Sequence, residues 1–331
     1  MTGLVDGFGR VHRDLRISLT DKCSLRCTYC MPAEGVPWIA KQSVLTPEEI
    51  ERVVRVAAEA GVGTVRLTGG EPLISPNLIE IVRRLAAIEG PEGPVEVAMT
   101  TNGIRLPDFI QGLEEAGLAR LNISIDTLDP DRFFQLTRRD RLIDVLAGIE
   151  AARRSRLGPL KLNAVVMRGV NEDEVVHLVE FAVERDAEMR FIEHMPLDLG
   201  HTWDRGEMVP REEILGSLRK KFVLEPIPGR GGAPAESFTI DGGPARVGVI
   251  ASVTAPFCAS CDRMRLTADG QLRNCLFARE ELDIRSALRE GADDQAITKI
   301  LRASVAGKRA GHGIDEPGFV QPERGMNAIG G

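Results

Sequence analysis

The sequence lacks any long uncharged apolar run, and nothing approaches the roughly 18 residues that a membrane span requires. Its N-terminal residues MTGLVD show no basic patch followed by an apolar stretch, so we expect no secretory signal. Excess positive charge is also absent, because 42 Lys and Arg residues oppose 49 Asp and Glu residues. This acidic balance argues against broad nucleic-acid binding. The 331 residues are 43% apolar and 27% charged, which is typical of a packed globular protein. We therefore expect a cytoplasmic enzyme with no membrane or nucleic-acid partner.

Cysteine is absent outside two tight groups of three. The first group is Cys23, Cys27 and Cys30, and the second is Cys258, Cys261 and Cys275. Clustered thiols in a cytosolic chain indicate metal or redox chemistry rather than disulfides. Three thiolates on one centre leave a coordination position open, as in a working site.

Strand-like and helix-like segments alternate six times in the first part of the chain. Thr46 as N-cap, Pro47 at the first helical position and Glu49 in a capping box predict a helix start. Six repeated units with short connections predict a parallel sheet. The expected strands are 15–19, 64–68, 95–100, 120–125, 160–167 and 188–193, and the helices are 47–60, 76–88, 107–116, 130–137, 142–155 and 172–185.

Polar or glycine-rich residues follow each of the six expected strands, from Thr20-Asp21-Lys22-Cys23 to Glu193-His194-Met195-Pro196. Such residues are common in any turn, but in barrel folds the carboxyl ends of the strands build the active site. Six such ends favour one shared pocket. We therefore predict an α/β fold in which residues 8–209 form an incomplete (β/α)6 TIM-like barrel rather than a doubly wound sheet.

The pattern changes beyond residue 210. We expect a helix at 211–221, a Pro/Gly-rich loop at 226–234, strands at 237–240, 246–250 and 263–267, and helices at 283–290 and 295–305. Residues 210–331 are interpreted as a C-terminal extension that carries the second cysteine group and covers one barrel opening. Gly307-Lys308-Arg309 is not a phosphate loop, because the upstream glycine and the following Ser or Thr are missing.

The spacing C-x3-C-x2-C of the first group allows three thiolates to bind three irons of a cubic cluster, leaving the fourth iron without a protein ligand. The alternative is a structural zinc site with a histidine as fourth ligand. His12 is the nearest histidine, but it precedes the strand and is poorly placed.

This spacing, the aromatic Tyr29 before the third cysteine, and Gly69-Gly70-Glu71-Pro72 after the second strand resemble the radical S-adenosylmethionine (SAM) superfamily. In that superfamily the open iron binds the amino and carboxylate groups of SAM. One electron then cleaves the sulfonium and yields a 5′-deoxyadenosyl radical. The reductant, the cofactor and the abstracted hydrogen must be held in contact, away from water.

The second group, C-x2-C-x13-C, resembles the C-terminal cluster of the MoaA family, the GTP 3′,8-cyclases of molybdenum cofactor biosynthesis. Taken alone, its C-x2-C half also suits zinc. The resemblance extends from about residue 8 to residue 331. It rests further on the segments RDLRIS at 13–18, RFIEHM at 190–195, DRMRL at 262–266 and the terminal Gly330-Gly331.

The resemblance implies two [4Fe-4S] clusters, one on each cysteine group, with SAM on the first and the guanine end of the substrate on the second. It places Tyr29 and Met195 at the adenine of SAM, Ser124 near its ribose and carboxylate, and the backbone of Gly70 at its amino group. A side chain at Gly70 would block that approach. Gly330 and Gly331 would enter the pocket for radical transfer, although a terminal glycine pair is commonly a disordered tail.

For the triphosphate, the resemblance supplies cations and one hydroxyl. Arg263 and Arg265 alternate along a strand and so point to one face, and either is a candidate for the final reduction and protonation. Structural salt bridges are the alternative role for each cation, since a charge inside a strand is costly without a partner. Thr64 stands where some family members carry a lysine. The implied substrate residues are Arg16, Arg66, Thr100, Lys161, Arg190, Arg263 and Arg265.

The expected reaction converts GTP to (8S)-3′,8-cyclo-7,8-dihydroguanosine 5′-triphosphate. The implied partners are an electron donor such as flavodoxin or ferredoxin and the downstream cyclic pyranopterin monophosphate synthase, and the resemblance allows a homodimer without requiring one. Two other readings remain: a radical SAM enzyme that modifies a peptide, which usually carries more C-terminal cysteines, and a zinc-stabilised binding module without redox chemistry.

Overall fold

A computed structural model describes residues 3–330 and arranges them around one twelve-stranded sheet, with a separate two-stranded hairpin of β3 (Glu89–Gly90) and β4 (Gly93–Pro94). Across the large sheet the strands are β14 (Leu282–Asp283), β13 (Gln271–Arg273), β12 (Arg263–Leu266), β1 (Asp14–Ser18), β2 (Thr64–Thr68), β5 (Glu96–Thr101), β6 (Arg120–Ser124), β7 (Lys161–Val166), β8 (Glu188–Glu193), β11 (Arg246–Ile250), β10 (Glu236–Ile240) and β9 (Leu224–Pro226).

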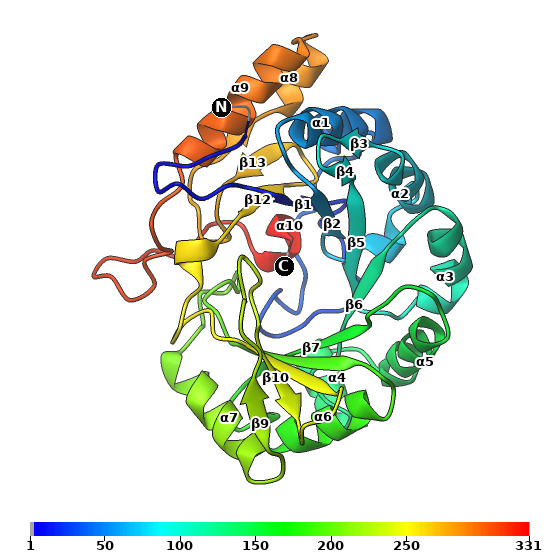
Figure 1. The fold of residues 1–331 in the computed structure, drawn as a ribbon, viewed down its shortest axis with the longest axis vertical. Helices are drawn as coiled ribbons and strands as arrows, with labels where there is room; N and C mark the ends of the chain where they lie inside the picture. Colours follow the sequence, from blue (N-terminus) through cyan, green and yellow to red (C-terminus); the bar gives the residue numbers. More distant parts are fainter. Residues whose placement is uncertain (1–2, 331) are drawn as a thin grey trace.

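Helices cover the outer face of this sheet, which curves around the C-terminal end of the chain (Figure 1). The α-helices are α1 (Pro47–Glu59), α2 (Leu78–Ala86), α3 (Leu106–Glu115), α4 (Pro130–Thr137), α5 (Leu142–Arg153), α6 (Val175–Val183), α7 (Arg211–Arg219), α8 (Arg285–Arg289), α9 (Asp294–Ala306) and α10 (Met326–Ile329). Five short 3-10 helices lie between them within the described residues, at 41–43, 72–74, 172–174, 205–207 and 258–260.

The six expected strands are confirmed as β1, β2, β5, β6, β7 and β8, which are neighbours in sequence order and parallel throughout. The α/β class is therefore confirmed. The capping box is also confirmed, because the Thr46 hydroxyl accepts from the Glu49 N–H and the Glu49 carboxylate accepts from the Thr46 N–H. Apolar side chains on the outer face of these strands pack against the helices in one continuous core.

The C-terminal region extends the same sheet at both sides. β12 pairs in parallel with β1, and β11 pairs in parallel with β8, so residues far apart in sequence become neighbours of the first and sixth strands. The expectation of β10, β11 and β12 is confirmed. β9, β13, β14 and α10 were not expected, because each is five residues or fewer and is fixed by pairing or packing rather than by its own periodicity.

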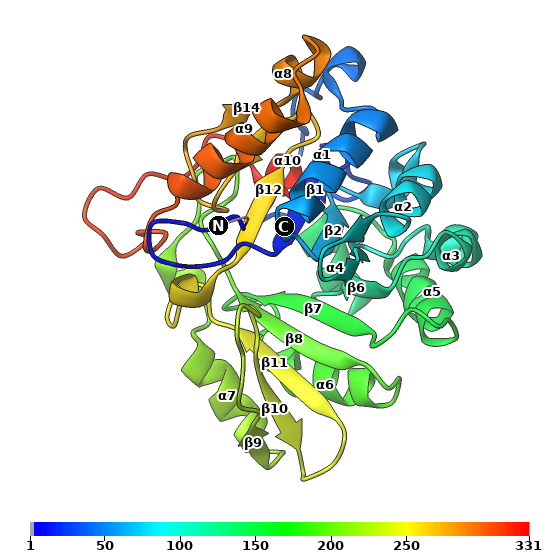
Figure 2. The same cartoon turned by 45° about the horizontal axis from the view of Figure 1, so that its top comes forward.

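The final helix α10 lies inside the curve of the sheet in both views (Figures 1 and 2). Within the described residues, no helix combines the length and the apolar character needed to cross a membrane. The inner face of the sheet is thus the one place where the N-terminal strands, the C-terminal strands and the chain end come together.

The close contact between Gly148 and Gly103 provides a test of this fold. Gly148 lies on α5, and a Cβ there would come within 2.1 Å of the Gly103 carbonyl oxygen, whereas Gly216 on α7 has nothing within 4 Å. We expect Gly148→Ala to lower the free energy of unfolding by about 2 kcal/mol, because backbone must move. Gly216→Ala should leave it unchanged or raise it by up to about 1 kcal/mol. Urea unfolding of both variants would check this, and equal stability for the two would contradict the packing.

Candidate functional site

The first cysteine triad lies in the loop that follows β1. Cys23, Cys27 and Cys30 are free and half-buried, and the Cys30 N–H donates to the Cys27 carbonyl at 3.0 Å. The end of α4 holds this loop: the N–H groups of residues 26 and 28 donate to the carbonyls of residues 137 and 136, each at 2.9 Å. The guanidinium of Arg138 also donates to the carbonyls of residues 26 and 31. The loop conformation is therefore fixed by protein contacts alone.

The glycine pair after β2 packs directly against the start of the same loop. A Cβ on Gly70 would lie 2.2 Å from the Lys22 carbonyl oxygen, and one on Gly69 would lie 2.4 Å from the Thr20 carbonyl oxygen. Gly70 also donates its N–H to the Thr20 carbonyl at 2.7 Å. The space that a side chain on Gly70 would need is filled by the cysteine loop, which gives a second reason for glycine at this position.

The next residue, Glu71, connects the loops that follow β2 and β5 and, through Asn102, the cysteine loop. It is 2% exposed, and its carboxylate accepts from the Thr101 hydroxyl at 2.6 Å and from the N–H groups of Asn102 and Leu73 at 2.7 and 2.9 Å. Asn102 in turn donates to the Ser24 hydroxyl at 3.0 Å. Glu71 is therefore the hydrogen-bonded link between the ends of β2 and β5 and the cysteine loop.

Burial dominates the electrostatics of the first triad. It raises the pKa of Cys23 to about 11, that of Cys30 to about 12, and that of Cys27 well above the usual value. Burial likewise raises the pKa of Glu71 to about 7 and that of Asp126 to about 6, and the charges of these carboxylates further raise the pKa values of Cys23 and Cys27.

The residues expected to contact SAM gather beside this triad. The Tyr29 hydroxyl donates to the Asp126 carboxylate at 2.7 Å, two residues beyond Ser124 at the end of β6. The Tyr29 ring lies edge-on to the His194 ring, with centroids 6.4 Å apart, and Met195 follows in sequence. The Tyr29–Asp126 bond was missed by sequence reasoning, although Asp126 stands at a polar strand end. Tyr29, Ser124 and Met195 thus approach one place at the carboxyl ends of β6 and β8.

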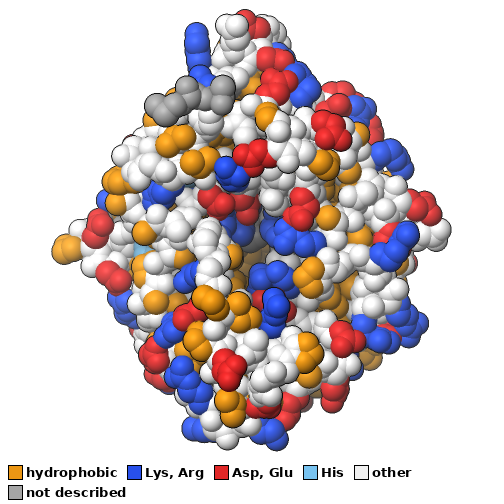
Figure 3. Space-filling view, viewed as in Figure 1, with side chains coloured by type: hydrophobic (Ala, Val, Ile, Leu, Met, Phe, Trp, Pro, Cys, Tyr) orange, Lys and Arg blue, Asp and Glu red, His pale blue; other side chains and the backbone are white. Residues whose placement is uncertain are grey.

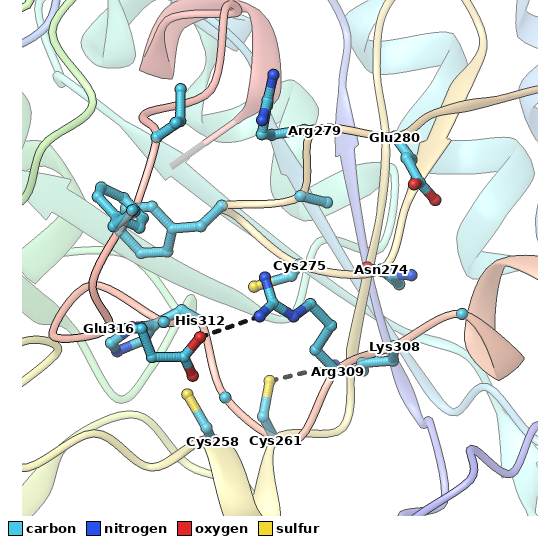
Figure 4. Close-up of a pocket in the computed structure, with 18 of the residues that line it drawn as sticks. Cys258, Cys261, Asn274, Cys275, Arg279, Glu280, Lys308, Arg309, His312 and Glu316 are labelled. Atoms are coloured by element: carbon cyan, nitrogen blue, oxygen red, sulfur yellow. Dashed lines mark hydrogen bonds and ion pairs between the residues drawn. The ribbon is translucent and has the colours of Figure 1, made fainter.

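The second triad lies beyond β11 and beside the hairpin of β12 and β13. Cys258 and Cys261 flank a 3-10 turn, in which the Cys261 N–H donates to the Cys258 carbonyl at 3.2 Å, and Cys275 follows β13. All three line a cavity of about 810 Å³ together with residues 307–320. Figure 4 shows their sulfur atoms facing the space also reached by Arg309, His312 and Glu316.

A second, smaller cavity lies on the inner side of this triad. It has a volume of about 70 Å³ and is lined by all three cysteines together with Met195, Arg263 and Arg265. The triad therefore separates an outer cavity from a space that leads toward the inner face of the sheet. Burial alone would raise the pKa of Cys261, but the charges of Lys308 and Arg263 outweigh it and lower that pKa. Burial raises the pKa of Cys258, as it does in the first triad, so the nearby cations distinguish Cys261 in particular.

The cysteine thiols of the two triads could hold either a zinc ion or an iron–sulfur cluster. No three His, Cys, Asp or Glu side chains in residues 3–330 are arranged to hold one metal ion, which does not match a single tetrahedral zinc site. A cubic cluster instead takes one thiolate on each of three irons, so three soft donors without a fourth ligand fit it. His12 does not join the first triad, because it is fully buried and lies 3.1 Å from the Asp6 carboxylate.

A band of cations lies on the inner face of the sheet. The strand register sets Arg16 directly beside Arg265 on one side and Arg66 on the other, and it sets Asn163 beside Arg190. Successive side chains alternate between faces, so residues in step with Arg16 share its face. Figure 3 shows Lys and Arg side chains around a hollow near the middle of this view. The band comprises Arg16, Arg66, Arg120, Lys161, Arg190, Arg263 and Arg265, and Thr100 of β5 is in step with it.

Some of these cations have carboxylate partners and others do not. Glu188 lies 2.7 Å from Arg190 and 3.8 Å from Lys161, and Asp14 lies 3.9 Å from Arg263. Within residues 3–330, by contrast, no carboxylate lies within 4 Å of Arg16, Arg66 or Arg265. Burial and the neighbouring guanidinium groups lower the pKa of Arg16 to about 10 and that of Arg66 to about 9. Structural salt bridges therefore account for Lys161, Arg190 and Arg263 but not for Arg16, Arg66 or Arg265.

Arg120 was missed by sequence reasoning. It opens β6 in the same phase as Asn122 and Ser124, and it forms an ion pair with Glu96 of β5. Its alternation with the apolar residues of the strand, in step with Asn122 and Ser124, could have indicated that it faces the same side as these residues. Thr64, where some relatives carry lysine, begins β2 beside Glu96.

The chain end reaches the same face. The Arg265 guanidinium donates to the Gly330 carbonyl, and a Cβ on Gly330 would lie 2.2 Å from the Thr68 hydroxyl and 2.6 Å from the Ser18 hydroxyl. Gly330 has a φ of +80°, which favours glycine. Asn327 of α10 donates to the Asp21 carbonyl at 3.0 Å. Gly330 is therefore held by contacts with the sheet, and Gly331 lies outside the described residues.

Comparison with known proteins matches the two halves of the chain to two families. Residues 17–182 match the model of the radical SAM superfamily, and residues 187–314 match that of the C-terminal region of molybdenum cofactor synthesis proteins. The chain is 56% identical over 331 residues to a GTP 3′,8-cyclase of Streptomyces coelicolor, covering 99% of this chain and 96% of that relative. It is 51% identical to a GTP 3′,8-cyclase of Corynebacterium glutamicum, covering 99% and 89%.

Among solved structures, Streptococcus suis SuiB is similar in fold, with a TM-score of 0.58 at 16% identity over 93% of this chain and 69% of SuiB. At this identity the likeness shows a shared fold and nothing more specific.

The packing of Gly70 generates a prediction. We expect Gly70→Ala to displace the Cys23 loop and to lower iron bound by the first triad, giving about four irons per chain instead of about eight. Gly63→Ala is the matched control, because a Cβ there meets nothing within 4 Å. Iron and sulfide analysis after anaerobic reconstitution measures both. A Gly70→Ala protein with the iron content of the control would show that the contact with Lys22 is not limiting.

Proposed function

The chain belongs to the GTP 3′,8-cyclase family of the radical SAM superfamily, and we propose that it acts through two iron–sulfur cluster sites at either end of one cationic pocket. Its reaction is the conversion of GTP to (8S)-3′,8-cyclo-7,8-dihydroguanosine 5′-triphosphate, the first step of molybdenum cofactor biosynthesis. The observation that supports this assignment to particular residues is the band of cations on the inner face of the sheet, of which Arg263 and Arg265 are buried and the others partly buried.

Cys23, Cys27 and Cys30 would hold a [4Fe-4S] cluster, and SAM would bind against it. When bound, this pair supplies a 5′-deoxyadenosyl radical that removes hydrogen from C3′ of the ribose, so that C3′ can bond to C8 of guanine. The chain's own residues position the cofactor: Tyr29, fixed by Asp126, and Met195 flank its adenine, while Ser124 and the Gly70 backbone contact its polar end. Buried Glu71 and the two glycines keep the cysteine loop in register with these residues.

The triphosphate would bind on the inner face of the sheet. Arg265 is buried, Arg16 and Arg66 are partly buried, and none of the three has a carboxylate within 4 Å in the described part of the chain. The Arg16 Nε and Arg66 Nη1 atoms also have no hydrogen-bond partner. Buried donors of this kind favour an anionic ligand, and guanidinium forks suit phosphate oxygens. Thr100, Lys161, Arg190 and Arg263 would complete the pocket.

Cys258, Cys261 and Cys275 would hold a second [4Fe-4S] cluster whose open position faces the guanine end of GTP. The smaller cavity joins this triad to Arg263 and Arg265, which supports a role for these arginines in the final reduction and protonation. We infer that the curved sheet is an incomplete (β/α)6 barrel, with residues 8–209 as its core and 210–331 as the auxiliary-cluster region. The proposed context is cytoplasmic, with flavodoxin or ferredoxin as electron donor, cyclic pyranopterin monophosphate synthase downstream, and a homodimer as the assembly to test.

The experiment that tests this function is anaerobic incubation of the reconstituted protein with SAM, GTP and a reductant. We expect 5′-deoxyadenosine and the cyclised nucleotide in equal amounts, detected by liquid chromatography and mass spectrometry. Cys27→Ala should form neither product, because it lacks a ligand of the first cluster. Cys258→Ala should retain SAM cleavage and lose most cyclisation. A wild-type protein that is colourless and carries zinc would overturn the proposal.

The threaded chain end generates a second prediction. Deleting Gly330 and Gly331 should leave folding, iron content and GTP binding largely intact but reduce cyclisation at least about a hundredfold, because the contact with Arg265 is lost. A short peptide ending in the same residues should restore some turnover. Gly330→Ala should mimic the deletion, whereas Gly311→Ala should not, since its Cβ meets nothing within 4 Å. A truncated enzyme with full-length turnover would show the tail to be inert.

A further inference from the structure

A buried lysine lies against the second triad. Lys308 follows α9 and is 6% exposed, and its Nζ lies 3.4 Å from the Cys261 Sγ and 2.8 Å from the Arg263 carbonyl oxygen (Figure 4). In the part of the chain that the structure describes, no carboxylate lies within 4 Å of this ammonium. A buried cation is costly without an anion. The anions within its reach are the thiolates of the triad.

The segment that carries Lys308 is anchored from the other end of the chain. The Arg10 guanidinium donates to the Cys258 carbonyl at 2.6 Å and to the carbonyls of Arg309 and Ala310 at 2.7 and 3.1 Å. Its own charge is neutralised by the Asp6 carboxylate at 2.5 Å. Arg10 therefore holds the backbone at Cys258 and at Arg309 and Ala310, and it makes no hydrogen bond to the Cys261 sulfur. Lys308 is the cation whose ammonium points at that sulfur.

The cation beside the first triad is Arg26, whose guanidinium donates to the Cys23 carbonyl at 2.8 Å and not to a sulfur. Within the described residues no lysine or arginine donates a hydrogen bond to a sulfur of this triad. The Cys23 sulfur accepts from neutral donors, the Leu25 N–H at 3.4 Å and the more distant Asn102 amide. Its charged surroundings include the buried carboxylates Glu71 and Asp126. The reduction potential of an iron–sulfur cluster rises with hydrogen bonds to its sulfurs and with nearby positive charge, because both stabilise the more negative reduced form.

We propose that Lys308 is a positioning residue of the second cluster site, whose ammonium hydrogen-bonds the Cys261 ligand and raises the reduction potential of that cluster above that of the SAM cluster. This inference rests on the proposed function, since it requires a cluster on the second triad. The couple is a one-electron change of the cluster between its 2+ and 1+ states. No bond is broken and no proton is transferred, and the electron comes from the external reductant.

The test compares the full-length holoenzyme with Lys308→Met, Lys308→Arg and the matched control Lys299→Met, which removes an exposed lysine on α9. Potentiometric titration with dithionite, followed by electron paramagnetic resonance, gives the midpoint of each cluster. The second signal is identified by its loss in Cys275→Ala. At the wild-type midpoint of this cluster, Lys308→Met should have a ratio of reduced to oxidised cluster at least tenfold lower, a shift of about 59 mV to more negative potential.

Lys308→Arg should retain most of the wild-type potential, and Lys299→Met all of it, while the SAM cluster is unchanged in every variant. A Lys308→Met protein with about eight irons per chain and an unchanged midpoint overturns the inference and leaves the proposed function standing. A wild-type protein with only about four irons overturns the proposed function itself. If Lys308→Met loses the second cluster, retention of that cluster in Lys308→Arg supports the positioning role. Its loss in Lys308→Arg as well contradicts a role for the positive charge.

Discussion

The burial of several guanidinium groups on one face of a parallel sheet is the constraint on which the rest of this structure depends. Arg16 stands in register between Arg265 and Arg66, and burial together with the charge of Arg16 lowers the pKa of both. A protein interior tolerates such a row only when oxygen acceptors or anions face it. The chain supplies one acceptor itself, the carbonyl of Gly330. Arg16 Nε and Arg66 Nη1 have no acceptor within the described residues, which supports the proposal that a polyanion binds this face.

The two cysteine triads have the same three thiol donors in different surroundings. The first triad is partly buried and lies near carboxylates. Its loop is held in place by contacts with Gly69, Gly70 and the end of α4. The second lies beside Lys308 and between two cavities, in segments drawn from β11, the hairpin and the end of α9. A site that must deliver a strongly reducing electron benefits from negative surroundings, whereas a site that binds substrate benefits from positive ones.

Much of this arrangement could be predicted from the sequence, and the limit is set by the range of the contacts. The strand at 188–193 and the helix at 130–137 follow from local periodicity and capping, and the structure has them at those bounds. The cysteine spacings and polar strand ends located the candidate site, because they are local patterns as well. The bond from Tyr29 to Asp126, the contact of Gly70 with Lys22 and the approach of Lys308 to Cys261 have no local signature. Each joins segments whose proximity only the folded sheet creates.

The chain end contacts segments that support both cysteine triads. Asn327 contacts the carbonyl of Asp21, two residues before the first cysteine, while Gly330 contacts Arg265 on the strand that leads from Cys261. A segment of four residues therefore touches the supports of both triads at once. Since glycine alone fits between the hydroxyls of Ser18 and Thr68, the position of this segment is set by the strands and not by its own conformational preference. A displacement of β1 or β12 would consequently move the chain end and the supports of both cysteine groups together.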